Sequence, residues 1–299
     1  MNAQLYGNPA HILPPQWTSV INSWLVEDTP SFDYGGFVVG EDIEEAKLYG
    51  KSKGILAGVP FFDEIFKQVG CTVTWHLKEG DIVAGNKTVV ATVRGPARCL
   101  LLGERVGLNV LARCSGIATQ SRKFLDIARS NSYKGIVAGT RKTTPGFRLV
   151  EKYGMLIGGV DPHRYDLSSM VMLKDNHIWS KGSIRQAVYS ARSVAGFSLR
   201  IDVEVSNEKD AIEAIEAGAD VVMLDNFSPE QIQISAESLK KKYKGSDRRF
   251  LIEVSGGLNE QNIGSHLCEH VDIYSTSNVH QGTSIVDFSL KIIPKNNKE

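Results

Sequence analysis

The chain has 299 residues, 42% apolar and 23% charged, which is typical of one large or two moderate globular domains. Basic and acidic residues number 34 each, so no overall field would draw the chain to nucleic acid or an anionic membrane. No apolar run approaches the ~18 residues that span a bilayer, and we expect no secretory signal. The four cysteines form no C-x-x-C pair. We therefore expect a cytoplasmic protein, and a nuclear presence fits the same composition.

The first part of the chain mixes helical and strand-like patterns. A helix is predicted over Trp17–Val26, before a turn that contains Pro30. Cys71–Leu77 and Lys87–Val93 are rich in β-branched residues and are separated by Gly-containing turns, which predicts two strands. From Pro96 onward, apolar residues recur at helical spacing.

These patterns predict a first domain over residues 1–120. The apolar segment Val286–Ile293 is expected to return to this domain, so residues 284–299 would join it. The charged tail Pro294–Glu299 is expected to fray.

The second predicted domain, residues 121–283, contains six short apolar runs that each end in polar or charged residues. They are residues 135–140, 170–173, 199–203, 221–224, 250–254 and 271–274. Amphipathic helical stretches separate most of them, with a capping residue at Ser183, another at Ser228 and a terminating glycine at Gly218. This alternation is typical of a parallel α/β barrel, whose strands all point their carboxyl ends at the mouth that holds the active site. Residues far apart in sequence are therefore expected to converge on one pocket.

Cations follow the first of these runs. The segment TRKTTPG begins at Thr140 and places Arg141 and Lys142 at the end of a strand. Arginine offers a planar fork to carboxylate or phosphate, whereas lysine acts as a mobile point charge. His163 and Arg164 lie in a turn-rich loop, DPHRYD, before the next run. The alternative for Arg141 and Lys142 is an ordinary basic pair on the surface. The alternative for His163 and Arg164 is a pair that forms its hydrogen bonds within the loop.

Lys174 and Asp202 stand on otherwise apolar strands. Lys174 is predicted to share a strand face with Met172, and Asp202 to share one with Glu204. Charges at such positions need a partner. A position of Lys174 opposite Asp202 or Glu204 would supply one. If Asp202 takes Lys174 lower in the barrel, Glu204 is left nearer the mouth for a ligand. A purely structural ion pair is the alternative.

Two carboxylates, Glu204 and Asp225, end consecutive strands about 20 residues apart. Hard oxygen donors of this kind suit Mg²⁺, which keeps positions for water and phosphate. Zinc would favour thiolate or imidazole ligands.

Small residues follow the last two strands. Ser255, Gly256 and Gly257 precede a helix predicted to begin near Asn259, where backbone N–H groups and the helix dipole could bind a phosphate. Residues 275–278 could complete this cradle. The motif SGG alone is weak evidence, but neighbouring strand ends of this kind are typical of phosphate sites in α/β barrels.

Taken together, these segments resemble the quinolinate phosphoribosyltransferase family, also called decarboxylating nicotinate-nucleotide pyrophosphorylases, and look like a fungal member. The resemblance runs from about residue 24 to residue 292 and is carried by five segments: Ala97–Thr119, Gly139–His177, Ile201–Asn207, Glu216–Phe227 and Glu253–Leu258. It implies an amino-terminal α/β sandwich domain followed by an irregular, incomplete α/β barrel. It also implies the transfer of phosphoribose from phosphoribosyl pyrophosphate to quinolinate with decarboxylation, requiring Mg²⁺ and no organic cofactor.

The resemblance also implies residue roles. Quinolinate carboxylates and nearby phosphates would be held by the cationic set Arg105, Arg141, Lys142, His163, Arg164 and Lys174. Glu204 and Asp225 would serve the metal and the ribose hydroxyls. The 5′-phosphate would be bound by Ser255–Gly257 with Thr276, Ser277 and Asn278, although many relatives have a glycine near that last strand end.

In the family, Arg105 of one protomer reaches the cavity of its partner, which implies a homodimer with shared sites and allows a hexamer. We expect Lys142, Lys174, Glu204 and Asp225 to act in catalysis, the two lysines through field and orientation rather than nucleophilic attack. Two alternatives stay open: a phosphoribosyltransferase that acts on another aromatic acid without decarboxylation, and a catalytically silent binding protein with the same pocket.

Overall fold

The computed structural model describes residues 7–294, which divide into two compact units. Residues 7–122, 144–159 and 282–294 form one unit, here called the antiparallel unit after its main sheet. Residues 123–143 and 160–281 form the other, here called the parallel unit. The domain limits drawn from the sequence, near residues 120 and 284, stay predictions. The predicted frayed tail lies outside the described residues beyond Pro294.

The antiparallel unit is built on a four-stranded sheet in the order β12-β1-β5-β3. The strands of this unit are β1 (Ile43–Gly50), β2 (Gly54–Ile55), β3 (Thr72–Trp75), β4 (Ile82–Val83), β5 (Thr88–Pro96) and β12 (Phe288–Ile292). Its helices are η1 (Pro9–Ile12), α1 (Trp17–Asp28), α2 (Tyr34–Val39), α3 (Val59–Gln68), the long α4 (Ala97–Ser130), of which residues up to 122 belong here, and α5 (Arg148–Gly158). The predicted return segment is β12, which pairs with β1.

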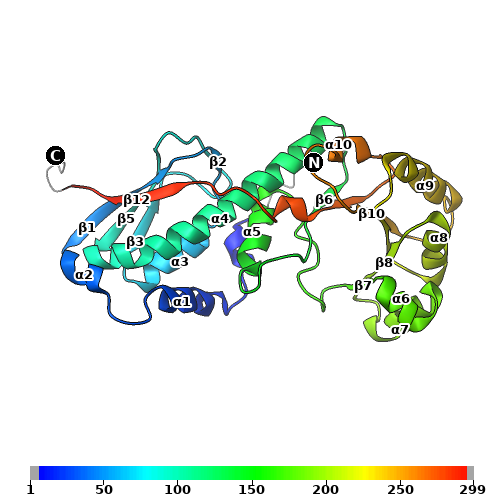
Figure 1. Ribbon diagram of the computed structural model, residues 1–299, viewed down its shortest axis with the longest axis horizontal. Helices are drawn as coiled ribbons and strands as arrows, with labels where there is room; N and C mark the ends of the chain where they lie inside the picture. The colour runs from blue at the N-terminus through cyan, green and yellow to red at the C-terminus, as the bar shows by residue number, and fades with distance from the viewer. Residues whose placement is uncertain (1–6, 295–299) are drawn as a thin grey trace. The chain divides into compact units, whose positions relative to one another are not determined.

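The core of this unit lies between the sheet and helices α3 and α4 (Figure 1). Phe62 and Phe66 of α3 are fully buried. Two glycines of α4 allow the close approach, because a Cβ added at Gly103 or Gly107 would lie about 3 Å from those rings.

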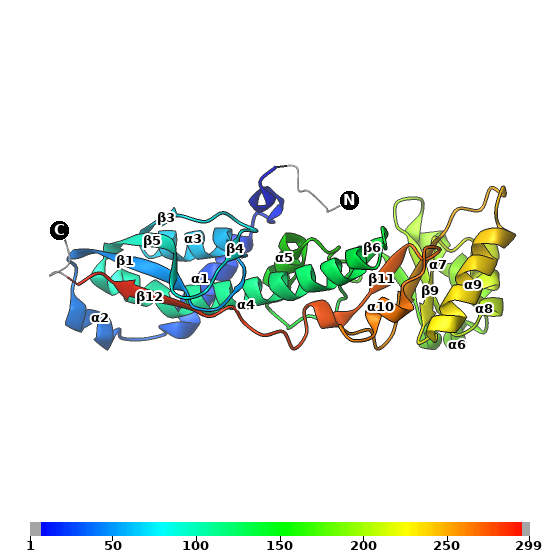
Figure 2. The ribbon, with the colours of Figure 1, turned by 90° about the horizontal axis from the view of Figure 1, so that it is seen from above.

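The parallel unit contains a six-stranded sheet in the order β6-β11-β10-β9-β8-β7. All its strand pairs are parallel. The strands are β6 (Ile136–Ala138), β7 (Val171–Leu173), β8 (Ile201–Val205), β9 (Val221–Asp225), β10 (Leu251–Ser255) and β11 (Ile273–Ser275). The helices and helical turns are α6 (Asp175–Lys181), α7 (Ile184–Ala195), α8 (Glu208–Ala217), α9 (Pro229–Lys242), α10 (Ile263–His266) and η2 (Ser277–Val279). Figure 2 shows α6 to α9 together on one side of these strands.

All six strands fall on the six apolar runs, so that prediction is confirmed. The helix caps are confirmed too. The Ser228 side chain accepts from the backbone N–H of Gln231, and Gly218 ends α8 with a φ of 95°. Within residues 7–294 no helix is both long enough and apolar enough to cross a membrane.

Two local predictions were wrong. No helix begins near Asn259: α10 starts at Ile263 and has four residues. The side chains of Asn259 and Asn262 instead accept hydrogen bonds from nearby backbone N–H groups, which favours turns over helix. Lys174 does not lie on a strand, because β7 ends at Leu173 and Lys174 caps α6.

Candidate active site

A cavity of about 550 Å³ lies at the carboxyl ends of the parallel strands. Its walls contain fourteen of the fifteen site residues predicted from the sequence. They are Thr140, Arg141, Lys142, His163, Arg164, Lys174, Glu204, Asp225, Ser255, Gly256, Gly257, Thr276, Ser277 and Asn278. The structure therefore brings together side chains that are up to 138 positions apart (Thr140 to Asn278).

Arg105 is the residue that is not brought to the cavity. It lies on α4 in the antiparallel unit, has an exposed side chain and does not line the cavity walls.

The early strands supply the positive wall. Nε of Arg141 is buried and has no hydrogen-bond partner in the described structure. The turn after β6 is fixed by Thr140, whose Oγ1 accepts from the backbone N–H of Lys142 at 3.1 Å and lies 3.0 Å from Nε2 of His280. Burial and the neighbouring Arg141 lower the pKa of Arg164, as expected where cations crowd together. This wall is arranged for an anion.

The middle strands supply carboxylates. Lys174 forms an ion pair with Glu204, which is one of the two partners that the sequence left open, rather than with Asp202. Asp202 is fully buried and its carboxylate oxygens have no hydrogen-bond partner within the described residues. Burial and Glu253 raise its pKa well above the ordinary value, while Arg164 and Lys174 act in the opposite direction.

Asp225, at the end of β9, lies among like charges. Burial raises its pKa, and the Glu204 carboxylate adds to this effect, although Lys174 opposes it. Its Oδ2 accepts from the side-chain amide of Asn226 at 2.6 Å. A cation beside Asp225 and Glu204 would relieve their mutual repulsion.

The late strands supply a small, polar wall. Gly256 and Gly257 have φ values of 106° and 59°, and a Cβ at Gly256 would lie 2.3 Å from the Asn226 side chain. Glycine is therefore required at position 256. On the next strand, Thr276 Oγ1 donates to the carbonyl of Leu258 and accepts from the backbone N–H of Asn278. Because α10 is short and starts six residues after Gly257, the predicted contribution of a helix dipole is wrong.

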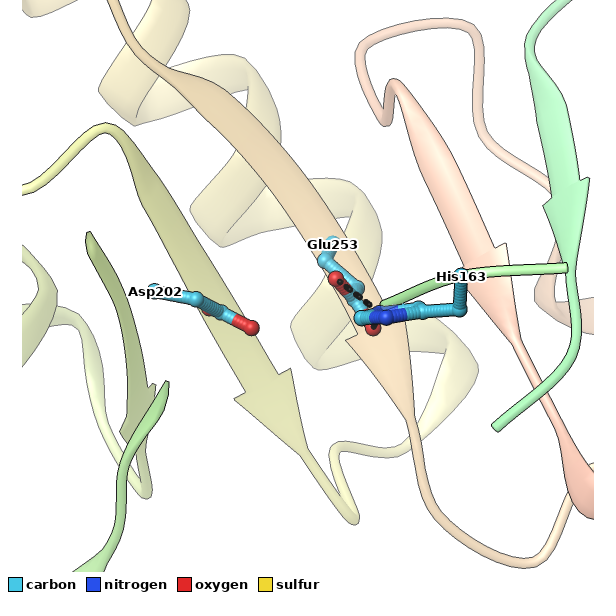
Figure 3. A group of neighbouring side chains, drawn as sticks. All are labelled: His163, Asp202 and Glu253. Atoms are coloured by element: carbon cyan, nitrogen blue, oxygen red, sulfur yellow. Dashed lines mark hydrogen bonds and ion pairs between the residues drawn. The ribbon is translucent and has the colours of Figure 1, made fainter. Parts of the chain in front are cut away.

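His163 and Glu253, which line the cavity, form a group with Asp202 (Figure 3). Glu253 comes from β10 and is buried, and its two carboxylate oxygens lie 3.2 and 3.3 Å from Nε2 of His163. Asp202, on β8, projects into the same space. The ligand atoms of the three lie within 4.8 Å of one another, which is close enough to raise the question of a metal ion.

The hydrogen bonds of His163 argue against a cation at this group. Nδ1 of His163 accepts from the backbone N–H of Arg164 at 2.7 Å, so the ring hydrogen is on Nε2. A metal at Nε2 would need that hydrogen on Nδ1, where it would face another N–H. We therefore assign His163 and Glu253 as a hydrogen-bonded pair, with the Asp202 carboxylate beside it.

Sequence reasoning missed Glu253 and His280. Glu253 stands inside an apolar strand, so the argument that singled out Asp202 would have found it as well. His280 follows the last strand with no recognisable pattern around it, and only the fold brings it to Thr140.

Comparisons with known proteins agree with this site. Residues 117–291 match the family described as "Quinolinate phosphoribosyl transferase, C-terminal domain", and residues 37–115 match its N-terminal domain. The chain belongs to the quinolinate phosphoribosyltransferase family. It is 48% identical over 287 residues to a human nicotinate-nucleotide pyrophosphorylase [carboxylating], covering 96% of this chain and 95% of that one. The corresponding rat protein is 49% identical over 282 residues, with 94% and 93% covered.

Solved structures of family members have the same fold. The nicotinate-nucleotide pyrophosphorylase of Francisella tularensis superposes with a TM-score of 0.86 at 29% identity, covering 96% of this chain and all of that one. NadC from Streptococcus pyogenes gives 0.84 at 32% identity, covering 97% and 100%. The predicted α/β fold class is therefore confirmed, with an amino-terminal sheet domain followed by a parallel-strand α/β domain.

Proposed function

We propose that the chain is a pentosyltransferase that transfers phosphoribose from phosphoribosyl pyrophosphate to quinolinate. The products are nicotinate mononucleotide, CO₂ and pyrophosphate, a step in NAD biosynthesis. The single observation that carries this proposal is the cavity, in which cations, carboxylates and a glycine turn face one another in a chain of this family.

Quinolinate carries two adjacent carboxylates, which need a wall with several cations. Arg141, with its buried and unpartnered Nε, is the strongest candidate for a carboxylate. Burial and repulsion from Arg141 lower the pKa of Arg164, and a carboxylate between the two guanidinium groups would relieve that repulsion. Lys142, Thr140 and His163 line the same cavity.

The donors at Glu204 and Asp225 fit Mg²⁺. Both are hard oxygen ligands, and burial together with the Glu204 carboxylate raises the pKa of Asp225, so a cation there would stabilise its ionised form. When bound, Mg²⁺ would neutralise charge on the pyrophosphate leaving group. The same carboxylates can orient the ribose hydroxyls, and Lys174 supplies a further positive charge beside them.

The 5′-phosphate is proposed to lie against the late strands. Gly256 and Gly257 leave the backbone accessible there, and Ser255, Thr276, Ser277 and Asn278 line the same wall. These groups bind a dianion without adding net charge near the reacting carbon.

The reaction follows from this placement. The pyridine nitrogen attacks the anomeric carbon, the bond from that carbon to the pyrophosphate oxygen breaks, and pyrophosphate leaves. Positive charge on the ribose is stabilised by the carboxylates, and negative charge on the leaving group by the cations. The ring nitrogen is then cationic, so the adjacent carbon–carboxylate bond can break with its electron pair left on the ring. CO₂ leaves and that carbon takes a proton, so no organic cofactor is required.

We also propose a homodimer in which Arg105 of one protomer completes the cavity of its partner, with assembly to a hexamer possible on the same interface. Arg105 is exposed and outside the cavity of its own chain, which is compatible with this role. The four cysteines are free and buried, as suits a cytoplasmic enzyme. Mixing inactive Arg105→Ala and Lys174→Ala chains should restore part of the activity after subunit exchange. Persistent inactivity in the mixture would assign Arg105 to its own chain.

Turnover with defined substrates tests the function itself. With quinolinate, phosphoribosyl pyrophosphate and Mg²⁺, one CO₂ should form per pyrophosphate. Equal activity on nicotinate without CO₂ would identify a non-decarboxylating enzyme instead. Binding of both substrates without products would identify a silent binding protein.

A further inference from the structure

Both ring nitrogens of His163 are already engaged by the protein. Nδ1 accepts from the backbone N–H of Arg164 at 2.7 Å, and Nε2–H donates to Glu253. The side chain of His163 is only 9% exposed. A ring held in this way has no free donor for a substrate carboxylate.

The backbone at His163 is held in an unfavourable conformation. Its φ is 62°, a left-handed value that a residue with a Cβ seldom adopts. The backbone N–H of His163 donates to Oδ1 of Asp161 at 2.6 Å. The hydrogen bonds of the His163 ring with Arg164 and Glu253 fix its side chain. Strain of this kind persists only where the surroundings over-determine the position, and it points to a function.

Glu253 is the fixed point of this arrangement. It is 1% exposed in the middle of β10, and it accepts from Oγ of Ser275 on β11 as well as from His163. Through His163 it therefore connects the sheet to the loop that carries Arg164. The guanidinium of Arg164 lies in the cavity wall, where Nη1 donates to the carbonyl of Met170 at 3.3 Å.

We propose that Glu253 is a positioning residue that holds the His163–Arg164 loop in place, so that Arg164 is presented to a carboxylate of the substrate. His163 then acts by transmitting this constraint rather than by binding substrate. The proposal rests on the proposed function, since it assumes that Arg164 binds an aromatic dicarboxylate.

Asp202 makes the test informative. It faces Glu253 without a hydrogen-bond partner among the described residues, so two carboxylates oppose each other in a buried space. Replacing Glu253 by Met removes that repulsion, which offsets part of the cost of leaving Nε2–H of His163 and Oγ–H of Ser275 without an acceptor. A loss of function in Glu253→Met can therefore be separated from a loss of fold by measuring the melting temperature.

The experiment compares Glu253→Met, which removes both acceptor oxygens, with Glu253→Gln, which keeps one oxygen for His163 and Ser275. Glu253→Met should raise the quinolinate KM and Kd by roughly tenfold or more, the size of a lost charge-assisted contact, and should change those for phosphoribosyl pyrophosphate much less. Glu253→Gln should keep the quinolinate KM and Kd close to the wild-type values. Glu269→Met, a change at an 86% exposed carboxylate, is the matched control and should behave as wild type.

Two results would overturn the assignment. One is a well-folded Glu253→Met enzyme with unchanged quinolinate binding, or with equal losses for both substrates. The other is a Glu253→Gln enzyme as impaired as Glu253→Met. Absence of turnover in the wild-type enzyme would instead refute the proposed function, so the two failures are distinguishable.

A double-mutant cycle tests how His163 acts. Asparagine tolerates the left-handed backbone better than most residues but is too short to reach Glu253, so His163→Asn breaks the link to Glu253. If His163 works through Glu253, the double variant His163→Asn with Glu253→Met should bind quinolinate no more weakly than the worse single variant. Multiplied losses would show that His163 contacts the substrate independently.

Discussion

Lys174 forms an ion pair with Glu204 at the mouth of the cavity. The pair joins the N-cap residue of α6 to the carboxyl end of β8. The Lys174 side chain is about half exposed, so the pair adds little to folding stability and can rearrange when a ligand enters. Because Glu204 already has this partner, Asp225 is the carboxylate with the greater need of a cation.

Asp225→Asn should therefore reduce the response of turnover to Mg²⁺. We expect a higher Mg²⁺ concentration for half-maximal activity and a lower maximal rate. The raised pKa means that ionisation of Asp225 is disfavoured by the fold, so the neutral variant should melt at least as high as wild type near pH 7. Asp247→Asn, on the exposed loop after α9, serves as control. An unchanged Mg²⁺ dependence would remove Asp225 from the metal site.

Arg141→Ala should weaken the binding of quinolinate more than the binding of phosphoribosyl pyrophosphate. Loss of a charge-assisted pair is worth ~1.5–3 kcal/mol, or roughly ten- to hundredfold in affinity. Calorimetric titration of each substrate measures the difference, with Arg249→Ala on the exposed basic loop as control. Equal losses for the two substrates would contradict the assignment.

Gly256→Ala should impair the phosphate wall. The added Cβ meets the Asn226 side chain, and the φ of 106° strains any residue other than glycine. We expect the KM for phosphoribosyl pyrophosphate to rise roughly tenfold while quinolinate binding is nearly unchanged. Gly218→Ala is a matched control, since it also has a positive φ but has open space around it and lies outside the cavity. A similar rise in the KM for phosphoribosyl pyrophosphate in both variants would mean that backbone strain in the protein, rather than the change at the cavity wall, is responsible.

Glu79 should make the antiparallel unit less stable as the pH rises. Burial raises the pKa of Glu79 from 4.5 to about 7, although the backbone N–H groups of Gly58 and Val59 act to lower it. The folded state therefore holds a proton that the unfolded chain releases above pH 4.5. The associated stability is present below that pH and is lost towards pH 7, by about 3 kcal/mol.

Urea unfolding between pH 4.5 and pH 7.5 measures this dependence. Glu79→Gln should flatten the slope, whereas Glu269→Gln should leave it as in wild type. A slope that is the same in Glu79→Gln would place its origin in other groups.

Much of the fold could be predicted because hydrophobic periodicity is a local property. The six parallel strands and the α8 and α9 boundaries follow from apolar runs, caps and a terminating glycine. The error near Asn259 arose because asparagine side chains compete with the helix for backbone N–H groups, and that outcome depends on the local geometry.

The sequence could predict that the site residues converge, but not which of them form ion pairs and hydrogen bonds with one another. Thr140 and Asn278 had to meet because parallel strands share one carboxyl edge. The choice of Glu204 over Asp202 by Lys174 depended on where β7 ends, and strand ends are the least certain feature of a sequence pattern. The hydrogen bonds of His163 likewise depend on a left-handed backbone conformation that no local sequence motif predicts.

A crystal structure of the Mg²⁺ enzyme with quinolinate and an unreactive phosphoribosyl pyrophosphate analogue tests the central claim most directly. The carboxylates of quinolinate should lie within hydrogen-bond distance of Arg141 and Arg164, and the 5′-phosphate should lie against Gly256 and Thr276. A dicarboxylate bound elsewhere on the molecule, with this cavity unoccupied, would contradict the account.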